Sequence, residues 1–214
     1  MKYIEFKNKV LRQPVIFSRD AVLFQQNKQV VRNQLERWCA RGLLIKLKRG
    51  VYLLNPDDRK IDPSMAYLAN QLYSPSYVSL EYALNYYGLI PERVSDVTSV
   101  ATKKTFRVKN NVGLFTYQHV KTKAFRGFRA LKDDAGLSIL VAEPEKAIVD
   151  FLYFNLDKFK GGDDENLLEE SYRLQNLETL KSGKVSEFAR FFGNSKLTRV
   201  CSSLIKLIKK EGSR

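Results

Sequence analysis

The chain is poor in the residues that build metal and disulfide sites. Its 214 residues include one histidine, His119, and two cysteines, Cys39 and Cys201, which lie far apart in sequence. A single histidine excludes a histidine cluster for a metal ion, and it is weak evidence for a catalytic triad. Two distant cysteines without a CxxC pair argue against a zinc site and a disulfide framework, and they suit a reducing cytoplasm. We therefore expect no metal and no cofactor.

Long hydrophobic runs and nucleotide-binding loops are also missing. No apolar stretch approaches the ~20 residues needed to cross a bilayer. The first ten residues, MKYIEFKNKV, are too polar for a signal peptide. Neither the GxxxxGK[ST] loop nor the GxGxxG loop occurs. The expectation is a soluble cytoplasmic protein with no membrane partner.

Acidic residues are scarce relative to basic ones. The chain has 23 Asp and Glu against 37 Lys and Arg, for a formal net charge of +14. Such an excess makes a polyanion the natural partner. The charge is concentrated, because residues 1–54 contain twelve basic and three acidic side chains. This concentration favours nucleic acid over a merely soluble basic protein.

The stretch NPDDRKIDP, residues 55–63, has two prolines and a polar run and predicts a linker. It separates a DNA-binding domain over residues 1–54 from a larger domain over residues 64–214. In the larger domain, SMAYLANQLY, LEYALNYYG and EPEKAIVDFLYFNL have helical spacing. Residues 95–121 predict two or three strands, and LSILVA predicts another. The predicted fold class is α+β: an N-terminal winged helix-turn-helix plus a larger mixed α/β domain.

Capping signals predict two short helices in the first domain. Ser18 is placed to cap a helix over about residues 19–24. After a polar turn, Asn27 is placed to cap a second helix over about residues 28–40, which Gly42 ends. Two helices joined by a short turn indicate a helix-turn-helix.

The second of these helices is predicted to enter the major groove of DNA. Val31, Leu35 and Trp38 fall on one side and are expected in the core. The opposite side holds Gln, Asn and Arg, whose donors and acceptors match base edges. The residues expected to read or flank the groove are Lys28, Gln29, Arg32, Asn33 and Arg37, with Gln29, Arg32 and Asn33 as the base readers.

The segment LLIKLKRGVYLL predicts a β-hairpin after this helix. Ile45 and Leu47 alternate with lysines, and Arg49-Gly50 suits a tight turn. Three basic residues near the tip are expected to hold phosphates: Lys46, Lys48 and Arg49. Two helices and a hairpin occur in many folds, and an exposed polar face is often only solvated. The order, the spacing and the charge together favour the winged helix.

A second basic segment lies in the larger domain, because residues 97–132 contain nine basic side chains and no acid. Aromatic residues are interleaved, which suits a nucleic-acid surface. The alternative is that the aromatics form strand core and the charges form a solvated face. The nine are Lys103, Lys104, Arg107, Lys109, Lys121, Lys123, Arg126, Arg129 and Lys132.

Four segments together resemble the AbiEi family of antitoxin-type transcriptional regulators. They are FSRDAVLF, VVRNQLERWCARGLLIKLKRGVYLL, SPSYVSLEYALNYYGLIP and AEPEKAIVDFLYF, in that order, from about Phe17 to Phe154. The resemblance implies an N-terminal winged helix, autorepression through inverted repeats in promoter DNA, and an antitoxin domain. It also implies a co-encoded nucleotidyltransferase-like toxin that is counteracted without a stable complex, in a system of defence against phage.

Two other classes of function stay open from the sequence. Glu143, Glu145 and Lys146 resemble the carboxylate–lysine grouping of a nuclease, which a winged helix would target to nucleic acid. Pro144, however, places them at a helix start, where acids are common because they complement the helix dipole. We favour that explanation and expect no enzyme. A module whose winged helix binds protein is the third class, and the charge distribution disfavours it.

Overall fold

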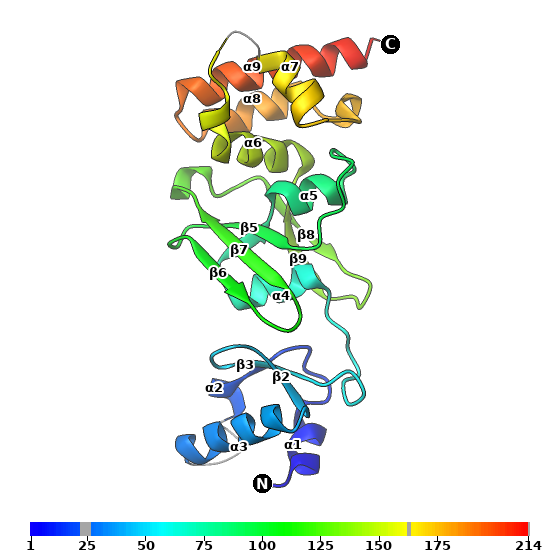
Figure 1. Ribbon diagram of the computed structural model, residues 1–214, viewed down its shortest axis with the longest axis vertical. Coiled ribbons are helices and arrows are strands. Elements are labelled where there is room, and N and C mark those ends of the chain that lie inside the picture. Colours follow the sequence, from blue (N-terminus) through cyan, green and yellow to red (C-terminus); the bar gives the residue numbers. More distant parts are fainter. Residues whose placement is uncertain (22–26, 162–163, 214) are drawn as a thin grey trace.

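Two clusters of buried apolar side chains organise the chain. The computed structural model describes residues 1–21, 27–161 and 164–213. Figure 1 shows an elongated molecule whose N- and C-termini lie at opposite ends, with a central sheet between an N-terminal unit and a C-terminal helical layer. The chain is a mixture of helices and strands, which is compatible with the predicted α+β class. No helix among the described residues is both long enough and apolar enough to cross a membrane.

The N-terminal unit packs helices against a small antiparallel sheet. Its elements are α1 (Tyr3–Val10), β1 (Ile16–Phe17), α2 (Ser18–Ala21), α3 (Lys28–Ala40), β2 (Leu44–Lys48) and β3 (Val51–Leu54). The sheet order is β1-β3-β2. The second half of the helix predicted over residues 19–24, and the start of the following turn, lie outside the described residues. The prediction did not include α1.

Local signals at both ends explain the bounds of α3. The Asn27 Oδ1 accepts hydrogen bonds from the amides of Gln29 (2.9 Å) and Val30 (3.3 Å), as an N-cap does. Gly42 has φ +71° and follows the C-cap. The amide of Leu43 reaches back to the Trp38 carbonyl at 2.9 Å, which makes a Schellman ending. Both predicted helix ends are confirmed.

Strand β2 keeps the expected alternation up to Leu47: Ile45 and Leu47 face the larger of the two buried clusters, and Leu44 faces the smaller one. Leu44 and Leu47 are the buried residues of β2, and Ile45 is only partly covered. The pairing with β3 becomes irregular only after Lys46, at a register shift between Lys46 and Lys48, which pair with Tyr52 and Val51 respectively. A bulge of this kind inserts an extra residue and changes the direction of the side chains that follow.

The rest of the chain builds a six-stranded mixed sheet with helices on both faces. Its main elements are α4 (Met65–Leu72), β4 (Ser76–Val78), α5 (Leu80–Tyr86), β5 (Val97–Ala101), β6 (Phe106–Lys109), β7 (Leu114–His119), β8 (Phe128–Lys132), β9 (Ser138–Ala142), α6 (Pro144–Phe154), α7 (Asp164–Asn166), α8 (Ser182–Arg190) and α9 (Ser195–Glu211). The strand order is β6-β7-β5-β4-β9-β8. Figure 1 shows α4 on the face toward the N-terminal unit and α5 and α6 on the other, with α8 and α9 stacked beyond α6.

Strand β3 contributes to both buried clusters. All four of its residues are buried. Val51 and Leu53 belong to the large cluster of the second unit, and Tyr52 and Leu54 belong to the cluster of the N-terminal unit. Successive side chains of a strand point to opposite faces, so β3 is covered on both sides. The N-terminal unit is therefore packed directly against the rest of the chain.

Candidate nucleic-acid interface

Helix α3 divides into a buried and an exposed face, as its spacing predicted. Val31, Leu35 and Trp38 have exposed fractions of 3%, 0% and 7%. The five residues predicted to contact DNA are all exposed: Lys28, Gln29, Arg32, Asn33 and Arg37. Three of them are cations, and within the described residues Lys28, Arg32 and Arg37 form no ion pair with a carboxylate. The face is thus free to meet an anionic partner.

Two of the predicted base readers are hydrogen-bonded to each other. The Gln29 Nε2 donates to the Asn33 Oδ1 at 2.9 Å, one helical turn away. The Arg37 Nε donates to the Asn33 carbonyl at 3.3 Å. This hydrogen bond leaves the Gln29 Oε1 as an acceptor and the Asn33 Nδ2 as a donor on two exposed side chains of α3.

The acid of α3 is neutralised by the hairpin. The Lys46 Nζ lies 2.7 Å from the Glu36 Oε1, and both side chains are exposed. This hydrogen bond raises the pKa of Lys46. Lys46 was predicted to hold a phosphate. In this structure its ammonium instead removes the one negative charge on the exposed face of the helix.

The other two hairpin cations differ in their surroundings. Arg49 is exposed at the tip. Lys48 is half-buried and donates from its Nζ to the Leu72 carbonyl at the end of α4. Burial, and then the charge of Lys103, lower the pKa of Lys48. Of the three predicted phosphate contacts, Arg49 is thus the one that points freely to solvent, and Lys48 sits at the contact between the two units.

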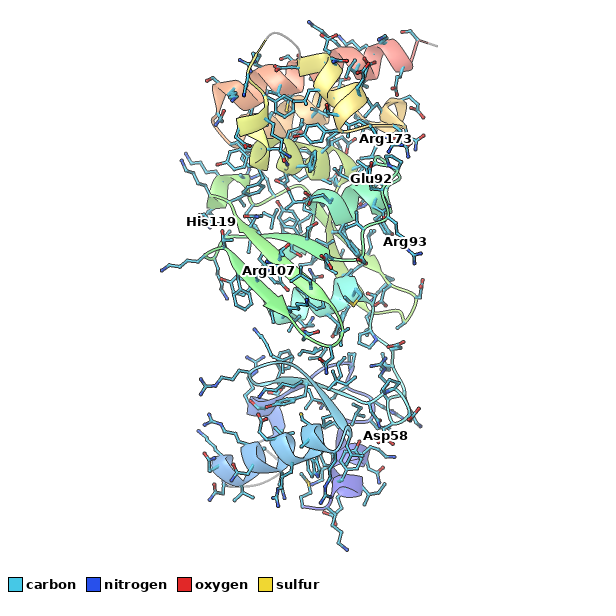
Figure 2. All side chains as sticks on the ribbon, in the orientation of Figure 1. Asp58, Glu92, Arg93, Arg107, His119 and Arg173 are labelled. Carbon is cyan, nitrogen blue, oxygen red and sulfur yellow. The ribbon has the colours of Figure 1, made fainter. Side chains whose placement is uncertain are left out.

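The predicted second basic surface is divided by the sheet order. All nine of its cations are exposed. Arg107 and Lys109 lie on β6, whereas Arg129 and Lys132 lie on β8, and these strands form opposite edges of the sheet. Lys103 and Lys104 belong to the β6 side, and Lys121, Lys123 and Arg126 follow β7. Figure 2 shows Arg107 and His119 on the β6–β7 side. The nine side chains therefore do not form one continuous surface, because neighbours in sequence are separated by the strand pairing.

The sequence analysis did not predict a contact that supports the buried face of α3. The Tyr3 ring of α1 meets the Trp38 ring at 5.5 Å between centroids. The Asp58 carboxylate accepts from the Tyr3 hydroxyl (2.7 Å) and from the Lys7 Nζ (2.8 Å). Those two hydrogen bonds lower the pKa of Asp58. Figure 2 places Asp58 beside α1, so the segment predicted as a linker is anchored to that helix. The apolar pair Phe6 and Val10, spaced one turn apart, was the available signal for α1.

The nuclease-like residues at the start of α6 are directed to separate partners. Glu143 pairs with Lys184 of α8. The Glu145 carboxylate is buried and accepts from the Lys181 amide at 3.1 Å. Lys146 is fully buried and pairs with Asp150. Among the described residues there is no cluster of three His, Cys, Asp or Glu side chains placed to hold a metal ion. The three groups do not converge on an open cleft.

Asp150 is the centre of this buried network. Its Oδ2 accepts from the Tyr77 hydroxyl (3.0 Å) and the Ser79 hydroxyl (2.8 Å), and the Lys146 Nζ also donates to the Tyr77 hydroxyl at 2.9 Å. Burial raises the pKa of Asp150 and lowers that of Lys146, and their mutual attraction offsets part of each change. The network ties β4 to α6 and has no exposed group for a substrate to meet.

Comparison with models of known protein families gives no match for this chain, and no curated protein is similar to it in sequence.

Proposed function

We propose that this protein is a sequence-specific DNA-binding autorepressor whose N-terminal unit is a winged helix-turn-helix. The observation that carries the proposal is the exposed face of α3. There, Lys28, Arg32 and Arg37 lie beside Gln29 and Asn33, with the nearby acid paired to Lys46. Such a face combines cations for phosphates with amides that match base edges.

The element order supports the winged-helix assignment. The chain runs α1-β1-α2-α3-β2-β3, and its sheet order is β1-β3-β2. In this arrangement α3 is the recognition helix and the β2–β3 hairpin is the wing. Arg49 at the hairpin tip is placed to reach a phosphate flanking the groove that α3 enters.

The pairing of Gln29 with Asn33 favours adenine as one of the bases that are read. Their mutual hydrogen bond leaves one acceptor and one donor facing outward. In the major groove adenine presents the N7 acceptor and the N6 amino donor, which is the complementary pattern. The operator is therefore expected to contain an adenine opposite this pair.

The antitoxin role is the second part of the proposal, and it rests on the resemblance to AbiEi regulators. The partner would be a co-encoded nucleotidyltransferase-like toxin, counteracted without a stable complex. The target DNA would be inverted repeats in the promoter of the shared operon. The surroundings of Glu143, Glu145 and Lys146 favour this regulator over a nuclease, because none of the three is free in an open cleft.

The decisive experiment measures binding to promoter DNA and to a scrambled duplex across a salt series. The double variant Arg32→Ala/Asn33→Ala is expected to lose promoter selectivity. The loss of the two side chains should cost about 1–3 kcal/mol of discrimination for each base contact. Residual binding should be equal for both duplexes and strongly dependent on salt.

Two controls make this result interpretable. Lys196→Ala removes a partly exposed cation at the start of α9, far along the chain from α3, and should leave promoter selectivity unchanged. A cleavage assay with divalent metal, on wild type and a Glu143→Gln/Glu145→Gln variant, tests the nuclease alternative. Equal binding of wild type to both duplexes would refute the repressor, and metal-dependent cutting lost in the variant would replace it with a nuclease.

A further inference from the structure

A shallow groove of about 720 Å³ opens where β5 and β7 end. It is lined by Tyr73, Thr102, Lys103, Lys104, Thr105 and His119. These residues supply two ammonium groups, two aliphatic hydroxyls and one imidazole, and none of them is acidic. We refer to it as the His119 groove. Its chemistry suits an anion that accepts several hydrogen bonds.

The turn that carries the two lysines is fixed by other elements. The His119 Nδ1 lies 3.0 Å from the Lys103 carbonyl. The Tyr73 hydroxyl donates to the Lys104 carbonyl at 2.8 Å. The Lys103 Nζ donates to the Ser74 carbonyl and lies over the Tyr73 ring. Because β7 and the segment after α4 both hold this turn, its remaining donors are positioned before any ligand arrives.

The contact of His119 determines which ring nitrogen faces a ligand. A carbonyl oxygen can only accept, so the Nδ1 must carry the proton that it shares with Lys103. The Nε2 is then the nitrogen that gains or loses a proton. In the neutral ring it presents a lone pair, which repels an anionic oxygen. In the protonated ring it presents an N–H, which makes a charge-assisted hydrogen bond to such an oxygen.

Further donors around the groove are unoccupied. Within the described residues, the Lys104 ammonium and the hydroxyls of Thr102 and Thr105 have no hydrogen-bond partner. Lys48 of the hairpin lies near enough to Lys103 for the two charges to repel. The charged and titratable groups facing this region are thus Lys48, Lys103, Lys104 and Tyr73, with no carboxylate among them. An anion would relieve the repulsion.

We propose that the His119 groove binds a phosphate group of a nucleic acid, and that protonation of His119 strengthens this binding. The proposal rests on the proposed function for the source of the phosphate, which would be the backbone of DNA bound by α3. Lys48 connects the β2–β3 hairpin to the groove, so the same duplex can reach both. Figure 2 shows His119 at the end of β7, and its side chain is exposed. A free nucleotide offers the same phosphate chemistry and is distinguished experimentally.

The imidazole can be observed directly, because the chain contains one histidine. The probe is the NMR titration of the His119 ring between pH 5 and 9, without ligand, with a saturating scrambled duplex, and with adenosine monophosphate. We expect the duplex to move the titration to higher pH, because phosphate favours the protonated ring. A shift with the mononucleotide and not with the duplex would mean that the groove binds phosphate, but that the phosphate belongs to a free nucleotide and not to DNA. A titration unmoved by both would overturn the proposal.

Binding measurements supply the second test. At constant ionic strength, wild type should bind the duplex about tenfold more tightly at pH 6 than at pH 8, as one added charge-assisted hydrogen bond implies. In His119→Asn the amide N–H can replace the Nδ1–H, so the turn is kept but no proton is gained. Its affinity should therefore be nearly independent of pH. An unchanged pH dependence in this variant would contradict the role of His119.

A matched pair of charge variants tests the location. Lys104→Gln should weaken duplex binding about threefold to tenfold at both pH values. Lys209→Gln, on α9 in the C-terminal helical layer, removes the same charge from an exposed position and should have no such effect. Equal effects would overturn the groove in favour of general attraction. Failure of the proposed function would show differently, as equal affinity for promoter and scrambled duplexes, since a phosphate contact carries no sequence preference.

Discussion

The largest free-energy cost of burying single residues in this protein concerns a pair of charged side chains. Lys146 and Asp150 have exposed side-chain fractions of 0%. Removing two charges from water is expensive, and their attraction compensates only when the remaining hydrogen bonds are also satisfied. Tyr77 of β4 and Ser79, which directly follows that strand, provide those hydrogen bonds. The buried ion pair is thus stable only when Tyr77 and Ser79 also form their hydrogen bonds to Asp150.

The Lys146→Met variant should be destabilised by about 3–5 kcal/mol at pH 7, because the buried Asp150 loses its partner and must either stay charged or take up a proton to fold. Without the lysine, the pKa of Asp150 rises further. The folded variant then holds a proton that the unfolded chain releases above about pH 4, the ordinary range of Asp, so the variant loses stability as the pH rises. Urea unfolding at pH 4 and pH 7 checks this: the gap to wild type should be smaller at pH 4.

The double variant Lys146→Met/Asp150→Asn is the control for this interpretation. A neutral amide at position 150 can still accept from the Tyr77 hydroxyl. The double variant should therefore be more stable at pH 7 than Lys146→Met alone, and its deficit should depend on pH less than that of Lys146→Met. A deficit of Lys146→Met that is the same at both pH values would show that lost packing, not charge, is responsible.

At the scale of elements, α3 owes its bounds to its caps. The Asn27 side chain satisfies two amides that no helical carbonyl can reach. Asn27→Ala should cost about 1 kcal/mol, and Asn27→Asp should cost much less, because a carboxylate caps equally well. Chemical unfolding followed by Trp38 fluorescence measures both. Equal losses in the two variants would mean that the cap hydrogen bonds contribute little.

Helices and strands that are marked by capping residues, proline or clear periodicity could be predicted from the sequence. Elements that lack such local signals could not. Helix α3 has a cap at each end, and α6 has Pro144 at its start. Strand β4 has only three residues, and β8 has the weak pattern FRALK. They exist because β4 pairs with β5 and β9, and β8 with β9. The pairings of β4 join distant parts of the chain, which local periodicity cannot reveal. Strand β8 pairs with the next strand, β9, across a short turn, but its own sequence has no regular alternation of apolar and polar residues.

The same limit applies to the candidate site. The exposed face of α3 follows from helical spacing, so its five residues could be named in advance. The sequence also contained the nine cations of the larger domain. Their separation onto the β6 and β8 edges depends on a strand order that no short segment encodes. The bulge before Lys48, which directs that lysine to α4, also results from pairing with β3.

At the scale of the whole molecule, β3 joins the two buried clusters. Leu53 faces the large cluster and Leu54 faces the cluster that contains Trp38. We expect the chain to unfold in one cooperative transition. Leu53→Ala should destabilise it by about 2–5 kcal/mol, although the residue faces away from the N-terminal cluster.

Two signals test this coupling. Trp38 is the only tryptophan, so its fluorescence reports the N-terminal unit, whereas far-UV circular dichroism reports mainly the helices of the rest. Both transitions should coincide in wild type and move together in Leu53→Ala and in the matched Leu54→Ala. If the Trp38 transition is separate and Leu53→Ala leaves it in place, the two units unfold independently.

The two-sided burial of β3 also has a consequence during synthesis. The ribosome releases β3 before any residue of the central sheet, so Val51 and Leu53 emerge while their later neighbours have not been made. Until the segment through β7 has followed, the nascent chain has an apolar strand face open to water and to other chains. Such intermediates are prone to aggregate. Cells that make this protein quickly should therefore need a chaperone at the ribosome exit more than cells that make it slowly.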